Sequence, residues 1–131
     1  MRFTKVLRNY VEDELTKKRI EANKNDPETQ AYQARRKKAI ADIEEIVKEA
    51  NRQASEILTA CNLEFFESAY NVRLISFNDG SIFNQKEFDA QRKREHDRYE
   101  KQKKAIQEIE VNCTLGADKA EFMRMLSEVS F

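Results

Sequence analysis

Glycine, proline and tryptophan are scarce in this chain of 131 residues, which has two glycines, one proline and no tryptophan. Sandwiches, barrels and propellers need glycine and proline in the many turns between their short strands, so this composition argues against all-β folds. Charged residues make up 37% of the sequence, against the usual quarter. We therefore expect long, exposed helices, and the length fits one ordinary domain.

Cysteine and histidine are also rare, because the chain has only Cys61, Cys113 and His96. Two cysteines are too few for a disulfide framework, and a structural zinc site requires four close ligands. We therefore predict reduced thiols and neither a metal nor a cofactor site.

Catalytic motifs are missing too, since the sequence contains no Gly-rich phosphate loop and no nucleophile motif. His96 and Glu100 lie four residues apart on one helical face, where such a pair could act as acid and base or as two metal ligands. No further ligand or base accompanies them. We predict an exposed, ion-paired His96, no catalytic residue and no enzymatic activity.

Neither an excess of one charge sign nor a long apolar run is present. The chain has 24 Lys and Arg and 24 Asp and Glu, so it lacks the global basic field of many nucleic-acid binders. Its first residues, MRFTKVLRNYVEDEL, carry charges every few positions, which fits neither a secretory signal nor a membrane span. We expect a cytoplasmic protein without a membrane partner.

Apolar residues spaced three and four apart predict helices along most of the chain. Thr4 can cap a helix within residues 1–26, and Asp26 followed by Pro27 is a start signal for a long second helix. That helix ends near Cys61 or continues to Tyr70. Its expected inward positions are Tyr32, Ala39, Ile40, Ile43, Ile46, Val47, Ala50, Ala54, Ile57, Leu58 and Cys61.

A turn signal at residues 78–80, Asn-Asp-Gly, separates two β-prone runs and predicts a β-hairpin, with a plain loop as the alternative. A short connection between two long helices implies an antiparallel helical hairpin, with shorter terminal helices packed at its open end. The predicted fold is therefore mainly α, with a short β-hairpin at the tip. The single domain 1–131 divides into an N-terminal helix 1–26, a long helix 27–70, the β-hairpin 71–84, a second long helix 85–113 and a C-terminal helix 114–131.

Basic residues gather in the stretch QRKREHDRYEKQKK, residues 91–104. Arg92, Arg94 and Arg98 could follow phosphates while Tyr99 stacks on a base, which makes direct nucleic-acid binding one hypothesis. Acidic residues within the stretch stand four positions before lysines, the spacing of ordinary intrahelical ion pairs. The alternative interpretation is a solvated helix face.

Acidic residues form a row on one side of the long helix. If that helix ends near Cys61, antiparallel pairing brings Arg98 to the level of Glu49, and the acidic and basic rows neutralise one another. If it continues to Tyr70, both rows are left as binding surfaces. The members of the acidic row are Asp42, Glu45, Glu49 and Glu56.

Aromatic residues near the predicted tip supply more apolar bulk than a small hairpin obviously hides, which indicates a local core or an interface. These residues are Phe65, Phe66, Phe77 and Phe83. On the long helix, Ala50 and Ala54 would allow close approach of a second helix, so a homodimer is possible.

The sequence therefore predicts a non-enzymatic, coiled-coil-like interaction protein whose partner is most simply another protein. Its short, charge-dense helical style resembles that of small accessory proteins of phages and mobile elements, several of which inhibit host or defence enzymes. No motif ties the chain to one family. A regulator or inhibitor docking on a nucleic-acid-processing enzyme is the leading hypothesis, and direct nucleic-acid binding through residues 91–104 is the alternative.

Overall fold

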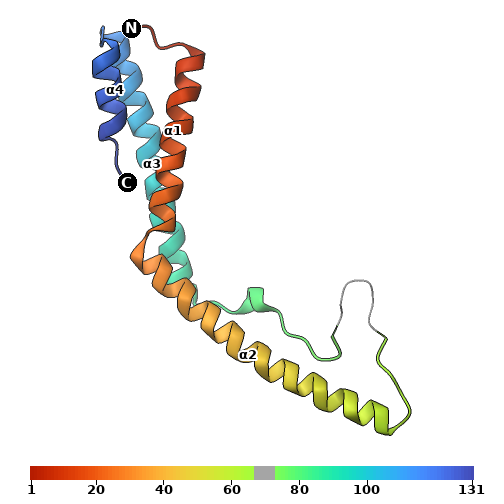
Figure 1. The fold of residues 1–131 in the computed structure, drawn as a ribbon. Helices are drawn as coiled ribbons and strands as arrows, with labels where there is room; N and C mark the ends of the chain where they lie inside the picture. The colour runs from red at the N-terminus through yellow and green to blue at the C-terminus, as the bar shows by residue number, and fades with distance from the viewer. Residues whose placement is uncertain (67–72) are drawn as a thin grey trace. The chain divides into compact units, whose positions relative to one another are not determined.

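The computed structural model describes residues 1–66 and 73–131, and within this part the fold is mainly α, as predicted (Figure 1). The chain divides into two compact units, Met1–Gln30 with Gln85–Phe131, and Ala31–Asn84. The helices are α1 (Lys5–Lys24), α2 (Pro27–Ala60), α3 (Gln85–Thr114) and α4 (Lys119–Glu128), with a single 3₁₀ turn, η1 (Asp79–Ser81), before α3.

The predicted β-hairpin at the tip is wrong, because residues 73–84 contain no strand. The Asn-Asp-Gly sequence does form a turn, but the side chain of Asn78 accepts a hydrogen bond from the Gly80 N–H at 3.0 Å. This side-chain bond starts the one-turn helix η1 instead of joining two strands. Residues 71 and 72, also assigned to the hairpin, lie outside the described residues.

The long helix α2 ends at Ala60, the earlier of the two ends considered from the sequence. Asn62 has a positive φ of 57°, a conformation that asparagine tolerates better than most residues. The Asn62 N–H donates to the Thr59 carbonyl and the Leu63 N–H to the Leu58 carbonyl, at 3.1 and 2.8 Å. This double closure is a Schellman motif, and residues 61–66 beyond it are not helical.

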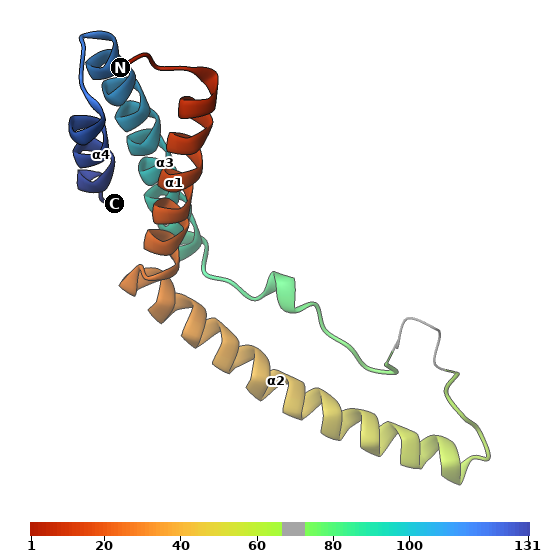
Figure 2. The same ribbon diagram turned by 45° about the horizontal axis from the view of Figure 1, so that its top comes forward.

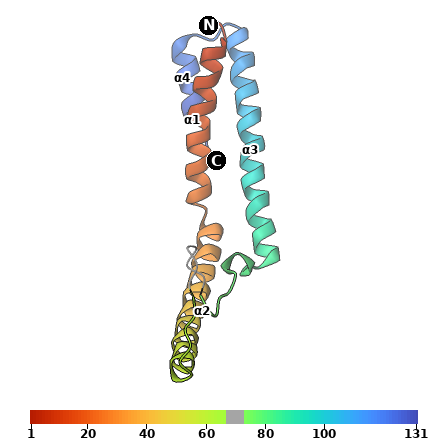
Figure 3. The same ribbon diagram turned by 90° about the vertical axis from the view of Figure 1, so that its right-hand side faces the viewer.

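In the first unit, α3 packs against both α1 and α4, and the three helices lie side by side (Figure 1, Figure 3). The α1–α3 pair is antiparallel, since Arg8 pairs with Glu110 at 2.6 Å and Asn23 accepts from Arg98 at 3.1 Å. The hairpin predicted from the sequence paired α3 with the helix beginning at Pro27 and placed α1 only at its open end. In the structure α1 packs along α3.

The core of this unit lies where all three helices meet. Leu15 and Val11 of α1 are fully buried, and burial raises the pKa of the Cys113 thiol on α3, so this cysteine stays protonated. Full burial of an aliphatic side chain stabilises a fold by roughly 1.5–3 kcal/mol. The core residues are Val11, Leu15, Ile106, Ile109, Cys113, Phe122 and Leu126.

Away from this core, the α1–α3 contact is polar. Gln102 is only 5% exposed, and its side chain accepts from Arg19 Nε at 2.7 Å and donates to Thr16 Oγ1 at 3.0 Å. Water reaches the edges of an interface between two helices more easily than the centre of three. Hydrogen-bonded polar groups are therefore tolerated there at lower cost.

Lys18 of α1 caps the C-terminal end of α4. Its ammonium group donates to the carbonyl oxygens of Leu126, Ser127 and Val129, at 2.9, 3.3 and 3.2 Å. The last carbonyls of a helix have no intrahelical partner and carry its negative dipole end, so a cation there is favourable.

We expect Lys18→Met to lower the free energy of unfolding by about 1–2 kcal/mol, because several charge-assisted hydrogen bonds are lost together. Lys17→Met is the matched control, since the Lys17 side chain is 75% exposed and pairs only with Glu14. Its effect should stay below about 0.5 kcal/mol. Urea unfolding followed by circular dichroism measures both variants, and equal losses would contradict the capping role.

In the second unit, residues 73–84 run alongside α2 (Figure 2). The Asn51 side chain binds the backbone of Ile75 twice, accepting from its N–H and donating to its carbonyl, each at 2.8 Å. Arg36 donates to the carbonyls of Asp79 and Ile82, at 2.8 and 2.6 Å. Helix side chains thus supply hydrogen bonds that a second strand would have supplied, which is the physical reason for the missing hairpin.

Candidate interaction surface on α2

The acidic row on α2 is largely paired within its own helix. Asp42 pairs with Lys38 at 3.2 Å, and Arg52 binds both Glu49 and Glu56. The hydrogen bond from Arg52 lowers the pKa of Glu49 to about 2. The predicted neutralisation by α3 is therefore replaced by local pairs at three- and four-residue spacing.

This row still carries more acid than base. Its four carboxylates are accompanied by two ion-paired cations, Lys38 and Arg52, and by Lys48, which lies three positions after Glu45. Among the described residues, Glu45 has no ion-pair partner. The surface therefore keeps an excess of negative charge.

A stripe of apolar side chains lies beside this row. Ile46 and Ile57 are 69% and 66% exposed, so the prediction that both lie at inward positions is wrong. On the neighbouring side of the helix, Val47 is buried and Asn51 is held to Ile75. The apolar face of α2 is therefore wider than the area that residues 73–84 cover.

The aromatic residues predicted for the tip do not share a β-hairpin. Phe66 and Phe83 are 89% and 52% exposed, and Phe77 is half-buried. Phe65 lines an open cavity of about 560 Å³ next to α2. These residues therefore lie in the irregular segments that follow α2 and precede α3.

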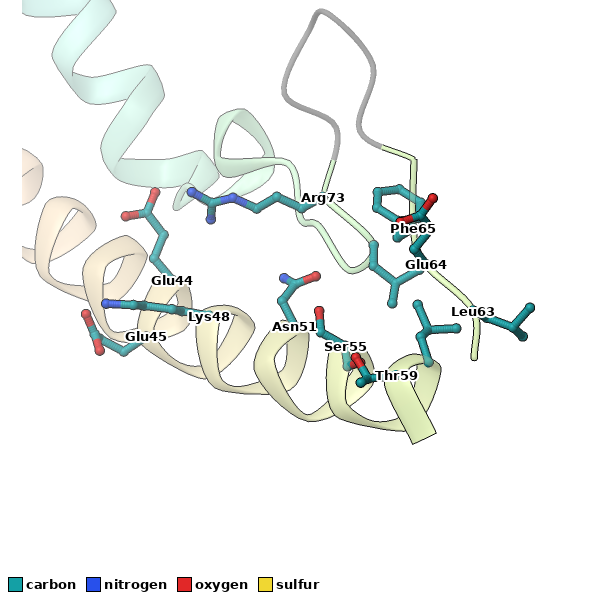
Figure 4. Close-up of a pocket in the computed structure, with 12 residues that line it drawn as sticks. Glu44, Glu45, Lys48, Asn51, Ser55, Thr59, Leu63, Glu64, Phe65 and Arg73 are labelled. Carbon is teal, nitrogen blue, oxygen red and sulfur yellow. The ribbon is translucent and has the colours of Figure 1, made fainter. Parts of the chain in front are cut away.

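The cavity next to α2 is bordered by residues of different character at its two ends (Figure 4). Glu44, Glu45 and Lys48 lie near one end, whereas Leu63 and Phe65 lie near the other. These side chains do not form an acid–base or nucleophilic constellation. In the described part of the chain, no cluster of three His, Cys, Asp or Glu could hold a metal ion.

Two arginines of the predicted basic surface are directed into the first unit. Arg94 donates to Asp26 at 3.1 Å and also to Glu28 and Thr29, and Arg98 donates to Asp26 at 2.5 Å. Asp26 is 4% exposed. The Thr29 N–H and then Arg98 stabilise its carboxylate by hydrogen bonds and hold the pKa of Asp26 well below its usual range. This cluster joins the start of α2 to α3.

The other two predicted nucleic-acid contacts also have partners within the unit. Tyr99 has Arg19 at 5.4 Å and Lys103 at 5.1 Å from its ring centre, and Arg92 lies 5.7 Å from the ring centre of Phe88. These are cation–π distances, so the ring of Tyr99 already carries two cations.

His96 is exposed and lies 3.7 Å from Glu100, as the sequence predicts. Lys103 binds the same carboxylate oxygen at 2.9 Å and lowers the pKa of Glu100. The stretch 91–104 is therefore an ion-paired helix whose arginines at 94 and 98 face its own fold.

Comparisons of the chain with protein-family models, with curated proteins and with solved structures found no match. No helix within residues 1–66 and 73–131 is long and apolar enough to cross a membrane. The candidate site thus rests on the geometry of α2 alone.

The exposed stripe could have been found in the sequence. Residues 39, 43, 46, 50, 53, 57 and 60 alternate steps of four and three, which is the heptad spacing of a coiled-coil seam. A second apolar series, Ile40, Val47, Ala54 and Leu58, runs beside it. The two series form one wide apolar face, and a single neighbouring segment covers only the second series.

Proposed function

We propose that this chain is a non-enzymatic interaction protein that binds another protein through α2, as a regulator or inhibitor. The exposure of Ile46 and Ile57 on one side of a regular helix carries this proposal. Two large aliphatic side chains in line on a helix, beside a polar row, are typical of a helix that packs against a partner. The cytoplasm stays the predicted compartment.

The acidic row supports a particular class of partner. A negatively charged helix face can compete with phosphates for the basic groove of a nucleic-acid-processing enzyme, since electrostatic complementarity steers association. Direct nucleic-acid binding has less support, because Arg94 and Arg98 are held by Asp26 within the first unit.

The proposal predicts a partner protein whose capture depends on the stripe. The tagged chain is used to capture proteins from cells of the organism that encodes it, and the eluate is analysed by mass spectrometry. Ile46→Ser with Ile57→Ser should reduce recovery of the partner at least about tenfold, since two buried aliphatic contacts are worth more than about 1.4 kcal/mol together.

Val6→Ser with Leu115→Ser is the matched control, because both side chains are 80% exposed and belong to the first unit. Circular dichroism of all variants checks that the helices are kept, and nuclease treatment removes bridging nucleic acid. Equal recovery with the two double variants, or recovery of nucleic acid alone, would contradict the proposed function.

A further inference from the structure

The stripe of α2 that contains the exposed Ile46 and Ile57 has the register of a coiled-coil seam over three heptads. From residue 39 to residue 60 it spans roughly 31 Å at 1.5 Å per residue. Ile43, Ala50 and Ile57 occupy one set of seam positions, and Ala39, Ile46, Gln53 and Ala60 occupy the other. Ile43 and Ala50 are half-buried, and the other five are exposed. We call these seven residues the seam.

The two flanks of the seam differ in character. On one flank Val47 is buried, and Ile40 and Ala54 are half-buried, on the side held to residues 73–84. The opposite flank presents Asp42, Glu49 and Glu56, spaced one heptad apart. In a coiled coil, the residues flanking the seam select the partner and its orientation. A partner helix bound to the seam would therefore lie next to carboxylates on the side away from Val47.

We propose that the seam binds one amphipathic helix of another protein, with aliphatic residues against the seam and Lys or Arg facing the acidic flank. This inference rests on the proposed function and names its partner chemistry. Lys38 and Arg52 offset part of the acidic charge, but the three carboxylates of the flank outnumber these two cations. Basic groups on the partner complete the neutralisation.

Charge also argues against a second copy of this chain as the occupant. In an antiparallel pair, equivalent flanks face each other, so Glu49 and Glu56 would meet the same acids of the copy. In a parallel pair, the acids of one helix would face the flank containing Val47, which is already buried in its own unit. Neither orientation places a cation row opposite the carboxylates.

Gln53 gives the seam one polar position among aliphatic ones. Its amide already donates to Glu49 at 3.2 Å, and a polar residue at a seam position still costs stability and favours a register in which the partner accommodates it. The partner helix is therefore expected to place a polar residue or alanine opposite Gln53.

Designed peptides test this inference on the full-length chain. The probe is a fluorescein-labelled 21-residue peptide of three heptads, with leucine along its apolar seam and lysine on both flanks; the comparison peptide has glutamate on both flanks. We expect saturable binding of the lysine peptide by fluorescence anisotropy, and at least about tenfold weaker binding of the glutamate peptide, since like charges oppose it.

Variants locate the binding site. Ile46→Ser with Ile57→Ser should weaken binding of the lysine peptide at least about tenfold. Glu49→Gln with Glu56→Gln should weaken it about three- to tenfold, with a smaller salt dependence than the wild type. Val6→Ser with Leu115→Ser should leave the affinity unchanged.

Three results would overturn the inference. Equal binding of both peptides would remove the role of charge, and lysine-peptide binding that survives the seam substitutions would place the site elsewhere. A dimer in sedimentation velocity that dissociates on Ile46→Ser with Ile57→Ser would make a second copy the occupant. If the stripe-dependent partner is captured from cells but no peptide binds, this inference fails while the proposed function stands.

Discussion

Asp26→Ala should lower the free energy of unfolding of the first unit by about 3 kcal/mol. The substitution removes the cap that accepts from the Thr29 N–H at 3.0 Å, a contribution of about 1 kcal/mol. It also leaves the half-buried guanidinium groups of Arg94 and Arg98 without their shared carboxylate, and breaking a buried pair costs about 3–5 kcal/mol. Both arginines are partly accessible to solvent, so the expected loss of unfolding free energy is about 3 kcal/mol, at the lower end of the range for a buried pair.

Glu28→Ala is the control within the same cluster. Glu28 also pairs with Arg94, at 2.8 Å, but its side chain is 77% exposed, so its loss should cost less than about 0.5 kcal/mol. Guanidinium chloride unfolding followed by circular dichroism compares the two variants. Similar losses would show that the buried carboxylate does not hold the start of α2 to α3.

The same carboxylate should make the unit sensitive to acid. The folded state lowers the pKa of Asp26 from 3.8, so folding favours the ionised form. This stabilisation is fully present above about pH 5 and is lost as the pH falls through 3.8 toward the lower pKa of the folded protein. Asp26→Asn keeps a capping oxygen without the charge. Its stability deficit relative to wild type should therefore shrink between about pH 5 and pH 2.

Phe122→Ala should cost about 3–5 kcal/mol, the range for removal of a fully buried aromatic ring. Phe122 is 3% exposed and lies in the core formed by α1, α3 and α4. The helix α4 has only ten residues, and isolated helices of this length are marginal in water. The stability of α4 therefore depends on its packing against the core. We expect α4 to lose protection from hydrogen exchange before α1 and α3.

Met123→Ala is the neighbouring control, since Met123 is 44% exposed and its truncation should cost less than about 1 kcal/mol. Urea unfolding gives the free energies, and hydrogen exchange with mass spectrometry follows α4 separately. An unchanged exchange rate of α4 in the Phe122 variant would show that the ring does not anchor the helix.

Local signals in the sequence predicted the helices well. Thr4 and Asp26 were each expected to cap a helix, and each side chain accepts from a backbone N–H three residues later. These signals act within one turn of helix, so they can be interpreted without knowledge of the fold. The acidic row and its lysine and arginine partners are likewise local, at spacings of three and four.

Contacts between distant residues could not be derived in the same way. Arg98 and Gln102 of α3 pack against α1 through polar contacts with Asn23 and Thr16, and Arg94 binds Asp26 between α1 and α2. The backbone N–H of Ile75 donates to the side chain of Asn51, 24 positions away in α2. No local pattern in the sequence predicts this hydrogen bond. The pairing of α3 with α1, and of residues 73–84 with α2, depends on such long-range side-chain hydrogen bonds, so the sequence alone did not predict it.

The two cysteines divide between the units and differ in access. Cys61 is exposed in the second unit, and Cys113 is 1% exposed in the core of the first. A thiol reagent under native conditions will therefore modify Cys61 at once and Cys113 only through opening of the α1–α3–α4 core. Cys61 can therefore carry a spectroscopic label on the second unit. The rate at which Cys113 is modified reports how often the first unit opens.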